Sequence, residues 1–257
     1  MVAAVALFVS VYLAAFLAAG YAAQALQLLY VQWIALGSVV CATAVVIRVF
    51  ERGRWDLGLA VPPAVAAADL LRGALLAAIL IGSADAMLLL FAHARHLRDG
   101  GFPWFELVMV FTPAALHEEL AFRGYIYQKI RRWNRIAAIG VTSLVFALLH
   151  LGNSGISPLA MLNLILAGVM LAMAYERNLR LWFPIAIHFV WNVLSGPILG
   201  YSVSGYDAGV TLLHTVVAGP AWLTGGAFGI EGSVCMTGVE VGGICWLANK
   251  LRISKFS

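Results

Sequence analysis

Charged side chains are the scarcest feature of this sequence. Asp, Glu, Lys and Arg make up 11% of the 257 residues, whereas 63% are hydrophobic. A soluble domain ordinarily carries about 25% charged residues. The chain has too few polar side chains to cover a surface in water. This composition argues against a water-soluble globule and indicates a protein that folds in a lipid bilayer.

Cysteine is also rare. Cys41, Cys235 and Cys245 lie in or beside apolar runs and form no CxxC or CxxxC pair. Because this spacing indicates neither a disulfide nor a metal site, we interpret the three as small apolar residues. No basic residue precedes the first apolar run, which is long enough to span a bilayer. We therefore expect a retained helix there and not a cleaved signal peptide.

Long apolar runs fill most of the chain. They cover residues 2–23, 30–50, 70–92, 102–128, 135–150, 158–176, 181–200 and 232–249. Because a spanning helix takes about 20 apolar residues, we predict an all-α, polytopic integral membrane protein of about eight transmembrane helices. We expect residues 1–257 to form a single membrane-embedded domain. The Gly-rich stretch 207–223 is predicted to be a partly buried or re-entrant connection between spans.

Lysine and arginine lie mostly on one side of the predicted spans. With a cytoplasmic N-terminus, only Arg95 and Arg98 fall outside, and Arg123 lies within a span. The others fall inside, namely Arg48, Arg52, Arg54, Arg72, Lys129, Arg131, Arg132, Arg135, Arg177, Arg180, Lys250, Arg252 and Lys255. This positive-inside pattern predicts that both termini are cytoplasmic, in an inner or plasma membrane. The net charge of +4 then reflects orientation, and we expect no nucleic-acid partner.

A cluster of polar side chains interrupts the run 102–128. It contains His117, Glu118, Glu119 and Arg123. A charge inside a span is costly, about 2.5–3.5 kcal/mol on insertion scales. Glu119 and Arg123 are four residues apart, so they share a helix face and can pair. Glu118, rotated by about 100° around the helix, is left without a partner on its own helix and needs one from another span.

Two later runs contain polar residues that can meet Glu118. Phe146 and His150 lie four apart in one run, and His188 and Asn192 lie four apart in the other. Measured from the basic turn that precedes residue 135, Glu118 and His150 lie at similar depths, about 22–26 Å along antiparallel helices. Asn192 lies at a comparable though shallower depth. These groups are therefore expected to converge inside the bilayer.

Such a set of side chains suits the hydrolysis of an amide without a covalent intermediate. A carboxylate and an imidazole on opposite sides of a water molecule can deprotonate it, which is a role for Glu118 and His150. A second imidazole and an amide can hydrogen-bond a developing oxyanion, which is a role for His188 and Asn192. No nucleophile elbow and no serine–lysine pair is evident in the sequence.

Zinc is an alternative to this metal-free arrangement. His117 and Glu118 begin an HExxH pattern, but position 121 is alanine, so the zincin motif is broken. Glu118, His150 and His188 still leave open a three-ligand site formed across helices. We expect no metal and no cofactor.

The three motifs, in this order, resemble the CPBP family of intramembrane proteases, which includes CAAX proteases of the Rce1 type and bacteriocin-processing enzymes. The family pattern EExxxR matches Glu118, Glu119 and Arg123. FxxxH matches Phe146 and His150, and HxxxN matches His188 and Asn192. The resemblance is strong over about 102–200, which we expect to be the catalytic core, and extends to the tail GPAWLTGGAFGIEGS at 219–233.

The resemblance implies a glutamate-dependent intramembrane endopeptidase that cleaves a peptide or a lipidated, CAAX-like protein. By the family pattern Glu118 and His150 activate water, and His188 and Asn192 form the oxyanion hole. Glu119 and Arg123 then brace the site or meet the substrate, with Phe146 beside them. In this family the cavity opens to the cytoplasm. The expected partners are a peptide or protein substrate and the bilayer.

Two other functions remain open. The first is a non-catalytic membrane protein of the same fold, such as a bacteriocin-immunity or scaffold factor. The second is a proton-coupled transporter that uses Glu118, Asp85 and the histidines as a relay. Asp85 is the other acid inside a predicted span, and we interpret it as structural. Glu231 and Glu240 flank the last run without an obvious partner.

Overall fold

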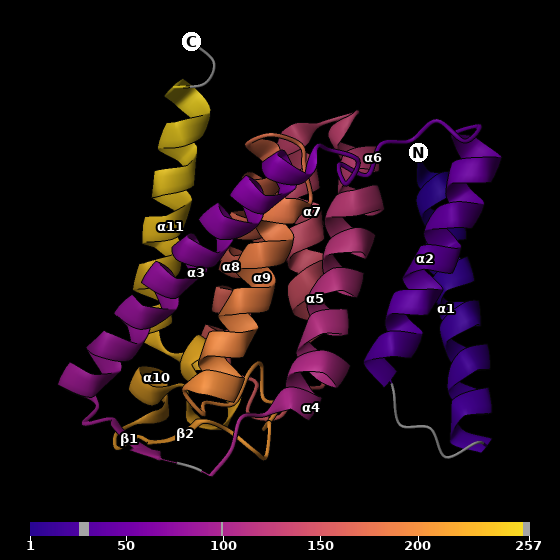
Figure 1. The fold of residues 1–257 in the computed structure, drawn as a ribbon. Helices are drawn as coiled ribbons and strands as arrows, with labels where there is room; N and C mark the ends of the chain where they lie inside the picture. Colours follow the sequence, from indigo (N-terminus) through magenta and orange to yellow (C-terminus); the bar gives the residue numbers. More distant parts are fainter. Residues whose placement is uncertain (26–30, 99, 254–257) are drawn as a thin grey trace.

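The computed structural model describes residues 1–25, 31–98 and 100–253. Lys255, one of the basic residues used to orient the chain, lies outside them. Within the described part the chain is built from helices and one small two-stranded sheet. Figure 1 shows the longer helices running side by side between two ends of the molecule. This arrangement confirms an all-α, membrane-type architecture.

The N-terminal part consists of three long helices. They are α1 (Val2–Ala25), α2 (Val31–Phe50) and α3 (Pro63–Phe91). The helices α1 and α2 pack on each other, and their buried residues join Tyr125 in one cluster, where the Phe8 and Tyr125 rings stack at 5.3 Å. The α1–α2 hairpin is thereby fixed to the helices that carry the expected site.

The longer of the remaining helices run between the same two ends of the molecule, and the shortest ones lie at one end or the other (Figure 1). They are α4 (Trp104–Glu106), α5 (Thr112–Glu119), α6 (Tyr127–Arg131), α7 (Arg135–Leu148), α8 (Pro158–Glu176), α9 (Trp182–Val193), α10 (Ala221–Thr224) and α11 (Val234–Ile253). Asn134 caps α7 by accepting a hydrogen bond from Ala137 N, and Ser157 caps α8 in the same way through Ala160 N.

The two ends of the molecule differ in composition. The end that we call the basic end carries residue 1, the connections 51–62, 132–134 and 177–181, and the last turns of α11 (Figure 1). The end that we call the loop end carries residues 92–98 and 100–103 and the connections 149–157 and 199–233. The small sheet lies at the loop end, where β1 (Arg95–Arg98) pairs antiparallel with β2 (Leu213–Val216).

The number of spans differs from the sequence-based expectation. Among the described residues, α1, α2, α3 and α8 are long and apolar enough to cross a membrane. The expected run 135–150 forms the 14-residue α7, and 181–200 is divided between α9 and the π-helical turn η3 (Leu194–Ile198). The run 232–249 forms α11, whose sequence includes Glu240, an asparagine and several glycines. Eight spans therefore remain a prediction.

The run 102–128 is helical but irregular. Two π-helical segments, η1 (Leu107–Phe111) and η2 (Leu120–Ile126), flank α5, so a chain of short segments connects Trp104 to Arg131. A π-helical turn inserts an extra residue and is frequent at functional sites. Here the second π segment begins directly after Glu119, at the centre of the polar cluster.

The stretch 207–223 is a partly buried connection, which is one of the two expected alternatives. It contributes strand β2 and part of α10, both at the loop end. Thr215 of β2 hydrogen-bonds His96 of β1 at 2.8 Å, and the other ring nitrogen of His96 lies 3.1 Å from Asp85 in α3. Tyr201 donates to the second oxygen of Asp85 at 2.7 Å, and burial together with this bond raises the pKa of the Tyr201 phenol. Asp85 thus holds the sheet to α3, which supports its structural interpretation.

Two close helix contacts depend on glycine. A Cβ on Gly73 of α3 would lie 2.6 Å from Phe183 O of α9. A Cβ on Gly168 of α8 would lie 2.8 Å from the Cα of Ser143 in α7. Such distances allow no side chain without movement of the backbone. The second contact matters for the site, because Gly168 O also accepts a hydrogen bond from Arg123 Nη2 at 3.0 Å.

Candidate active site

A cavity of about 660 Å³ lies between the helices that carry the three motifs. Glu118, Phe146, His150, His188 and Asn192 all line it. The volume is in the range of ligand pockets, which are about 300–1,000 Å³. The structure therefore brings the four residues expected to be catalytic, from α5, α7 and α9 and their ends, to one space, as the helix-depth argument predicts.

Glu118 presents a carboxylate with unused hydrogen-bonding capacity. Its side chain is 21% exposed, and Oε2 is buried without a hydrogen-bond partner among the described residues. The nearest cationic partner is His188, whose Nε2 lies 3.8 Å from Oε2, too long for a hydrogen bond. A water molecule or a substrate group bound in the cavity can use this oxygen.

His150 is fixed at one nitrogen and available at the other. It lies just beyond the end of α7, and its Nδ1 is 2.8 Å from Phe146 O. Because a carbonyl only accepts, Nδ1 carries the hydrogen, and in the neutral ring Nε2 then holds a lone pair. No protein partner of Nε2 is present among the described residues. A base nitrogen oriented in this way suits contact with a water molecule.

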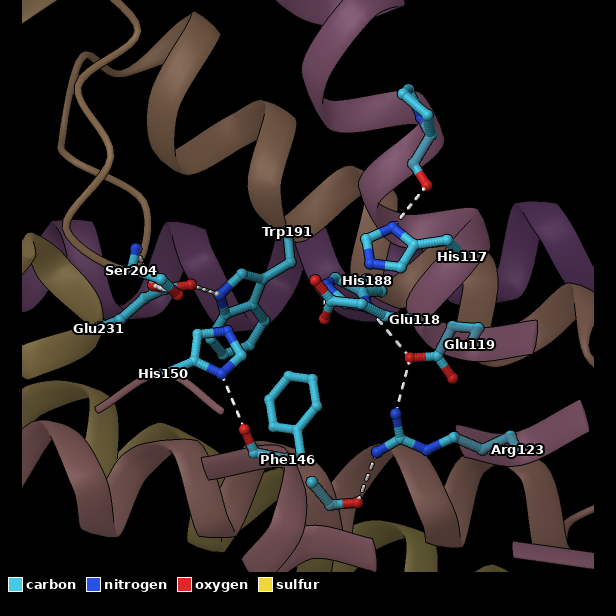
Figure 2. A network of polar contacts seen from close by, with 12 residues as sticks. His117, Glu118, Glu119, Arg123, Phe146, His150, His188, Trp191, Ser204 and Glu231 are labelled. Atoms are coloured by element: carbon cyan, nitrogen blue, oxygen red, sulfur yellow. Dashed lines mark hydrogen bonds and ion pairs between the residues drawn. The ribbon is translucent and has the colours of Figure 1, made fainter. Parts of the chain in front are cut away.

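His188 is held by the buried pair that follows Glu118 in the sequence. Its Nδ1 donates to Glu119 Oε1 at 3.0 Å, and Arg123 Nη1 donates to the same oxygen at 2.9 Å (Figure 2). Glu119 and Arg123 are both completely buried. Neither lines the cavity, so the structure places them as supports of His188 and not against a substrate.

Phe146 is the apolar centre of the arrangement. Its ring centroid lies 4.8 Å from that of His150 and 6.2 Å from that of His188, and the Arg123 guanidinium lies 5.5 Å above the ring. Figure 2 shows the ring between His150 and the Glu119–Arg123 pair. The ring thus packs beside both histidines and lies against the buried Arg123.

Asn192 and His117 neighbour His188 and Glu118, but only Asn192 lines the cavity. Asn192, one helical turn after His188, is 8% exposed and lines the cavity, so its amide can reach a bound group. His117 is adjacent to Glu118, but its Nδ1 bonds Pro113 O at 3.0 Å and it does not line the cavity. His117 is therefore a bystander in this geometry.

Glu231 is the residue of the site that sequence reasoning missed. It lines the cavity, and its carboxylate accepts hydrogen bonds from Trp191 Nε1 at 2.8 Å, Ser204 N at 2.5 Å and Ser204 Oγ at 2.8 Å (Figure 2). Asn163 of α8 holds the Glu231 carbonyl at 2.7 Å. The signal in the sequence was an acid in an apolar, Gly-rich tail, but its partners are distant along the chain.

The cavity mouth is made by two connections of the loop end, 149–157 and 199–233. Asn153 Nδ2 donates to Ser204 O at 2.8 Å, and Gly205 N donates to Phe228 O at 3.0 Å. Tyr206 lies in the same loop as Ser204 and lines the cavity. Burial, together with the nearby Glu106 and Asp207, raises the pKa of the Tyr206 phenol. The mouth therefore presents neutral polar and aromatic groups together with the carboxylate of Glu231.

A three-ligand metal site is not formed by the residues that the structure describes. In this part of the chain no group of three His, Cys, Asp or Glu side chains is close enough to hold an ion. His188 directs one nitrogen to Glu119, and His150 directs one to a backbone carbonyl.

The comparison with known families agrees with these motifs. Residues 100–194 match the family model described as type II CAAX prenyl endopeptidase Rce1-like. This segment contains all three motifs, and the match confirms the CPBP/Rce1-type family expected from them. Over these residues the chain is similar to that family, and its own fold is that of a helical, membrane-type protein. No curated protein and no solved structure matches the chain.

Proposed function

We propose that this protein is an intramembrane endopeptidase in which Glu118 and His150 activate a water molecule. The observation that carries the proposal is the convergence of four polar groups on one cavity, with a free carboxylate oxygen on Glu118 and a fixed base tautomer of His150. The family match supports the reaction class. The substrate is a peptide or a protein, with a lipidated, CAAX-like tail as one candidate.

The proposed reaction is direct hydrolysis. The water oxygen attacks the scissile carbonyl carbon while Glu118 and His150 take its proton, so a C–O bond forms and the carbonyl oxygen becomes an oxyanion. The C–N bond then breaks, and the proton returns to the leaving nitrogen. The products are a carboxylic acid and an amine, and no covalent enzyme intermediate forms.

His188 and Asn192 are proposed to stabilise the oxyanion. The Asn192 side-chain amide can donate a hydrogen bond at any pH, because it does not titrate. Because Nδ1–H of His188 is committed to Glu119, the ring donates from Nε2 only when both nitrogens carry hydrogen. Removing one oxyanion donor typically costs about 10²–10³ in rate. Glu119 and Arg123 act through His188 and are positioning residues.

The proposal is tested by comparing peptide termini in cells that express wild type, Glu118→Ala or Glu106→Ala. Glu106 belongs to none of the three motifs and does not line the cavity, so Glu106→Ala is the matched control. We expect termini that appear with wild type and Glu106→Ala and are lost with Glu118→Ala. Intact C-termini that appear only in the Glu118→Ala cells indicate that the protein trims tails. Intact leader peptides in those cells indicate that it processes N-termini.

A non-catalytic immunity or scaffold protein predicts a different result. Its protection or partner binding would tolerate alanine at Glu118, His150 and His188. Identical termini in all three cell lines, with equal amounts of each protein in the membrane, would favour this alternative and contradict the protease.

A further inference from the structure

Most of the basic residues lie at the end of the molecule opposite to the cavity mouth. At the basic end are Arg48, Arg52, Arg54, Lys129, Arg131, Arg132, Arg135, Arg177, Arg180 and Lys250. At the loop end, the basic residues that the structure describes are Arg95 and Arg98 of β1. By the positive-inside rule this contrast orients the basic end toward the cytoplasm.

The cavity reaches the loop end. Its outer walls come from the first residues of α2 (Val31 and Gln32), from Phe105 in α4, and from the loops with Ser154 and Tyr206. All of these segments lie at the loop end in Figure 1. No residue of the basic-end connections 51–62, 132–134 or 177–181 lines the cavity.

The opposite route is closed by packed side chains. The Glu119–Arg123 pair, which follows Glu118 along the chain toward the basic end, is completely buried. Toward the basic end follows a buried cluster that includes Tyr127, Tyr175 and Leu181. Beyond it, Glu176 is bound by Arg131 and by Arg135, the latter at 2.9 Å. These layers separate the described cavity from the basic end.

We infer that the substrate enters the site from the extracytoplasmic side of the membrane. The inference rests on the proposed function and names its substrate class: a peptide segment of an exported or membrane-anchored protein, bound at the outer surface of the bilayer. A prenylated tail of a cytosolic protein would have to approach from the closed end. The cytoplasmic opening implied by the family resemblance and the cytoplasmic termini implied by the charges are incompatible in this structure.

The lining of the cavity describes the chemistry of this segment. Phe105, Met109 and Val203 provide apolar walls, and Gln32 and Asn153 provide neutral hydrogen-bonding groups. Among the described residues, no lysine or arginine lines the cavity. An extended stretch of apolar and small neutral residues is the occupant that these walls fit, because buried charges without partners are costly.

Cysteine accessibility tests the side of entry without reference to activity. In a background that lacks Cys41, Cys235 and Cys245, Ser154→Cys places a thiol at the exposed cavity mouth and Trp133→Cys places one at the basic end, where Trp133 is 72% exposed. A membrane-impermeant maleimide is added to intact and to permeabilised cells. We expect Ser154→Cys to react in intact cells and Trp133→Cys only after permeabilisation. The reverse pattern overturns the inference.

The positions of the cleavage sites in the substrates provide a second test of the side of entry. Termini that depend on Glu118 are expected in extracytoplasmic segments of membrane or exported proteins. Glu118-dependent termini in cytoplasmic tails would overturn the inference and leave the protease intact. Absence of any Glu118-dependent terminus would instead contradict the proposed function, while the maleimide result would still decide the orientation of the cavity.

Discussion

Glu119 receives His188 Nδ1 at 3.0 Å on the same carboxylate oxygen that receives Arg123 Nη1 at 2.9 Å. One oxygen thus connects α5, the following π-helical segment and α9 at a completely buried position. The second acid of the EExxxR motif is therefore occupied, and the first acid, Glu118, is the carboxylate that the proposed mechanism uses. The two adjacent glutamates have different tasks because the helix points them to different neighbours.

Glu119→Gln is expected to destabilise the protein and to impair the positioning of His188. The substitution leaves the Arg123 guanidinium buried without a counter-charge, which typically costs about 3–5 kcal/mol. Chemical or thermal unfolding in detergent micelles measures this loss. If the unfolding midpoint of Glu119→Gln equals that of wild type, the buried pair is not a support.

The double variant Glu119→Leu with Arg123→Met is expected to be more stable than Arg123→Met alone. Removing both charges eliminates the uncompensated buried carboxylate that the single variant creates. Cleavage by the double variant should stay low, because His188 loses its acceptor. Recovery of stability without recovery of activity separates folding from positioning. Equal stability of the single and double variants contradicts the argument.

Glu231→Ala is expected to reduce kcat/KM by loosening the wall of the cavity mouth. The substitution leaves the donors of Trp191 and Ser204 without their acceptor, and each unsatisfied buried group costs about 1–3 kcal/mol. Ser204→Ala removes only one of these bonds and is the graded control. We expect its effect to be smaller and to fall mainly on KM. Equal rates in both variants and wild type would remove Glu231 from the site.

Cleavage is expected to be insensitive to metal chelators. The reason is the donor geometry, since the described residues form no three-ligand group and His188 is committed to Glu119. Activity of the purified protein is measured with and without a strong zinc chelator. Loss on chelation that is restored by added zinc would point to a metalloprotease instead.

The fold class and the main site follow from local sequence patterns. Residues four apart share a helix face, so Glu119 and Arg123, and the FxxxH and HxxxN pairs, were placed correctly without coordinates. Counting residues from the basic turn also placed Glu118 and His150 in one cavity. These predictions hold because helix geometry converts sequence spacing directly into position.

Other features depend on contacts that spacing does not encode. The partners of Glu231 lie on α9 and in the loop of Ser204, so its role appears only when the tail folds back on the cavity. The stretch 207–223 was expected to be a partly buried or re-entrant connection, but its pairing with β1, a segment more than a hundred residues earlier, was not predicted. The side on which the cavity opens depends in the same way on which helix ends lie together.

The most direct test of the account is the cleavage rate of the purified, reconstituted protein with Glu118→Gln, measured beside Glu106→Gln on a substrate identified from the termini comparison. Glutamine keeps the size of Glu118 but removes its basicity, and general base catalysis contributes about 10²–10⁴ in rate. The account predicts a loss of at least about 10² in kcat for Glu118→Gln, with unfolding unchanged, and wild-type rates for Glu106→Gln. A wild-type rate in Glu118→Gln would contradict the proposed mechanism.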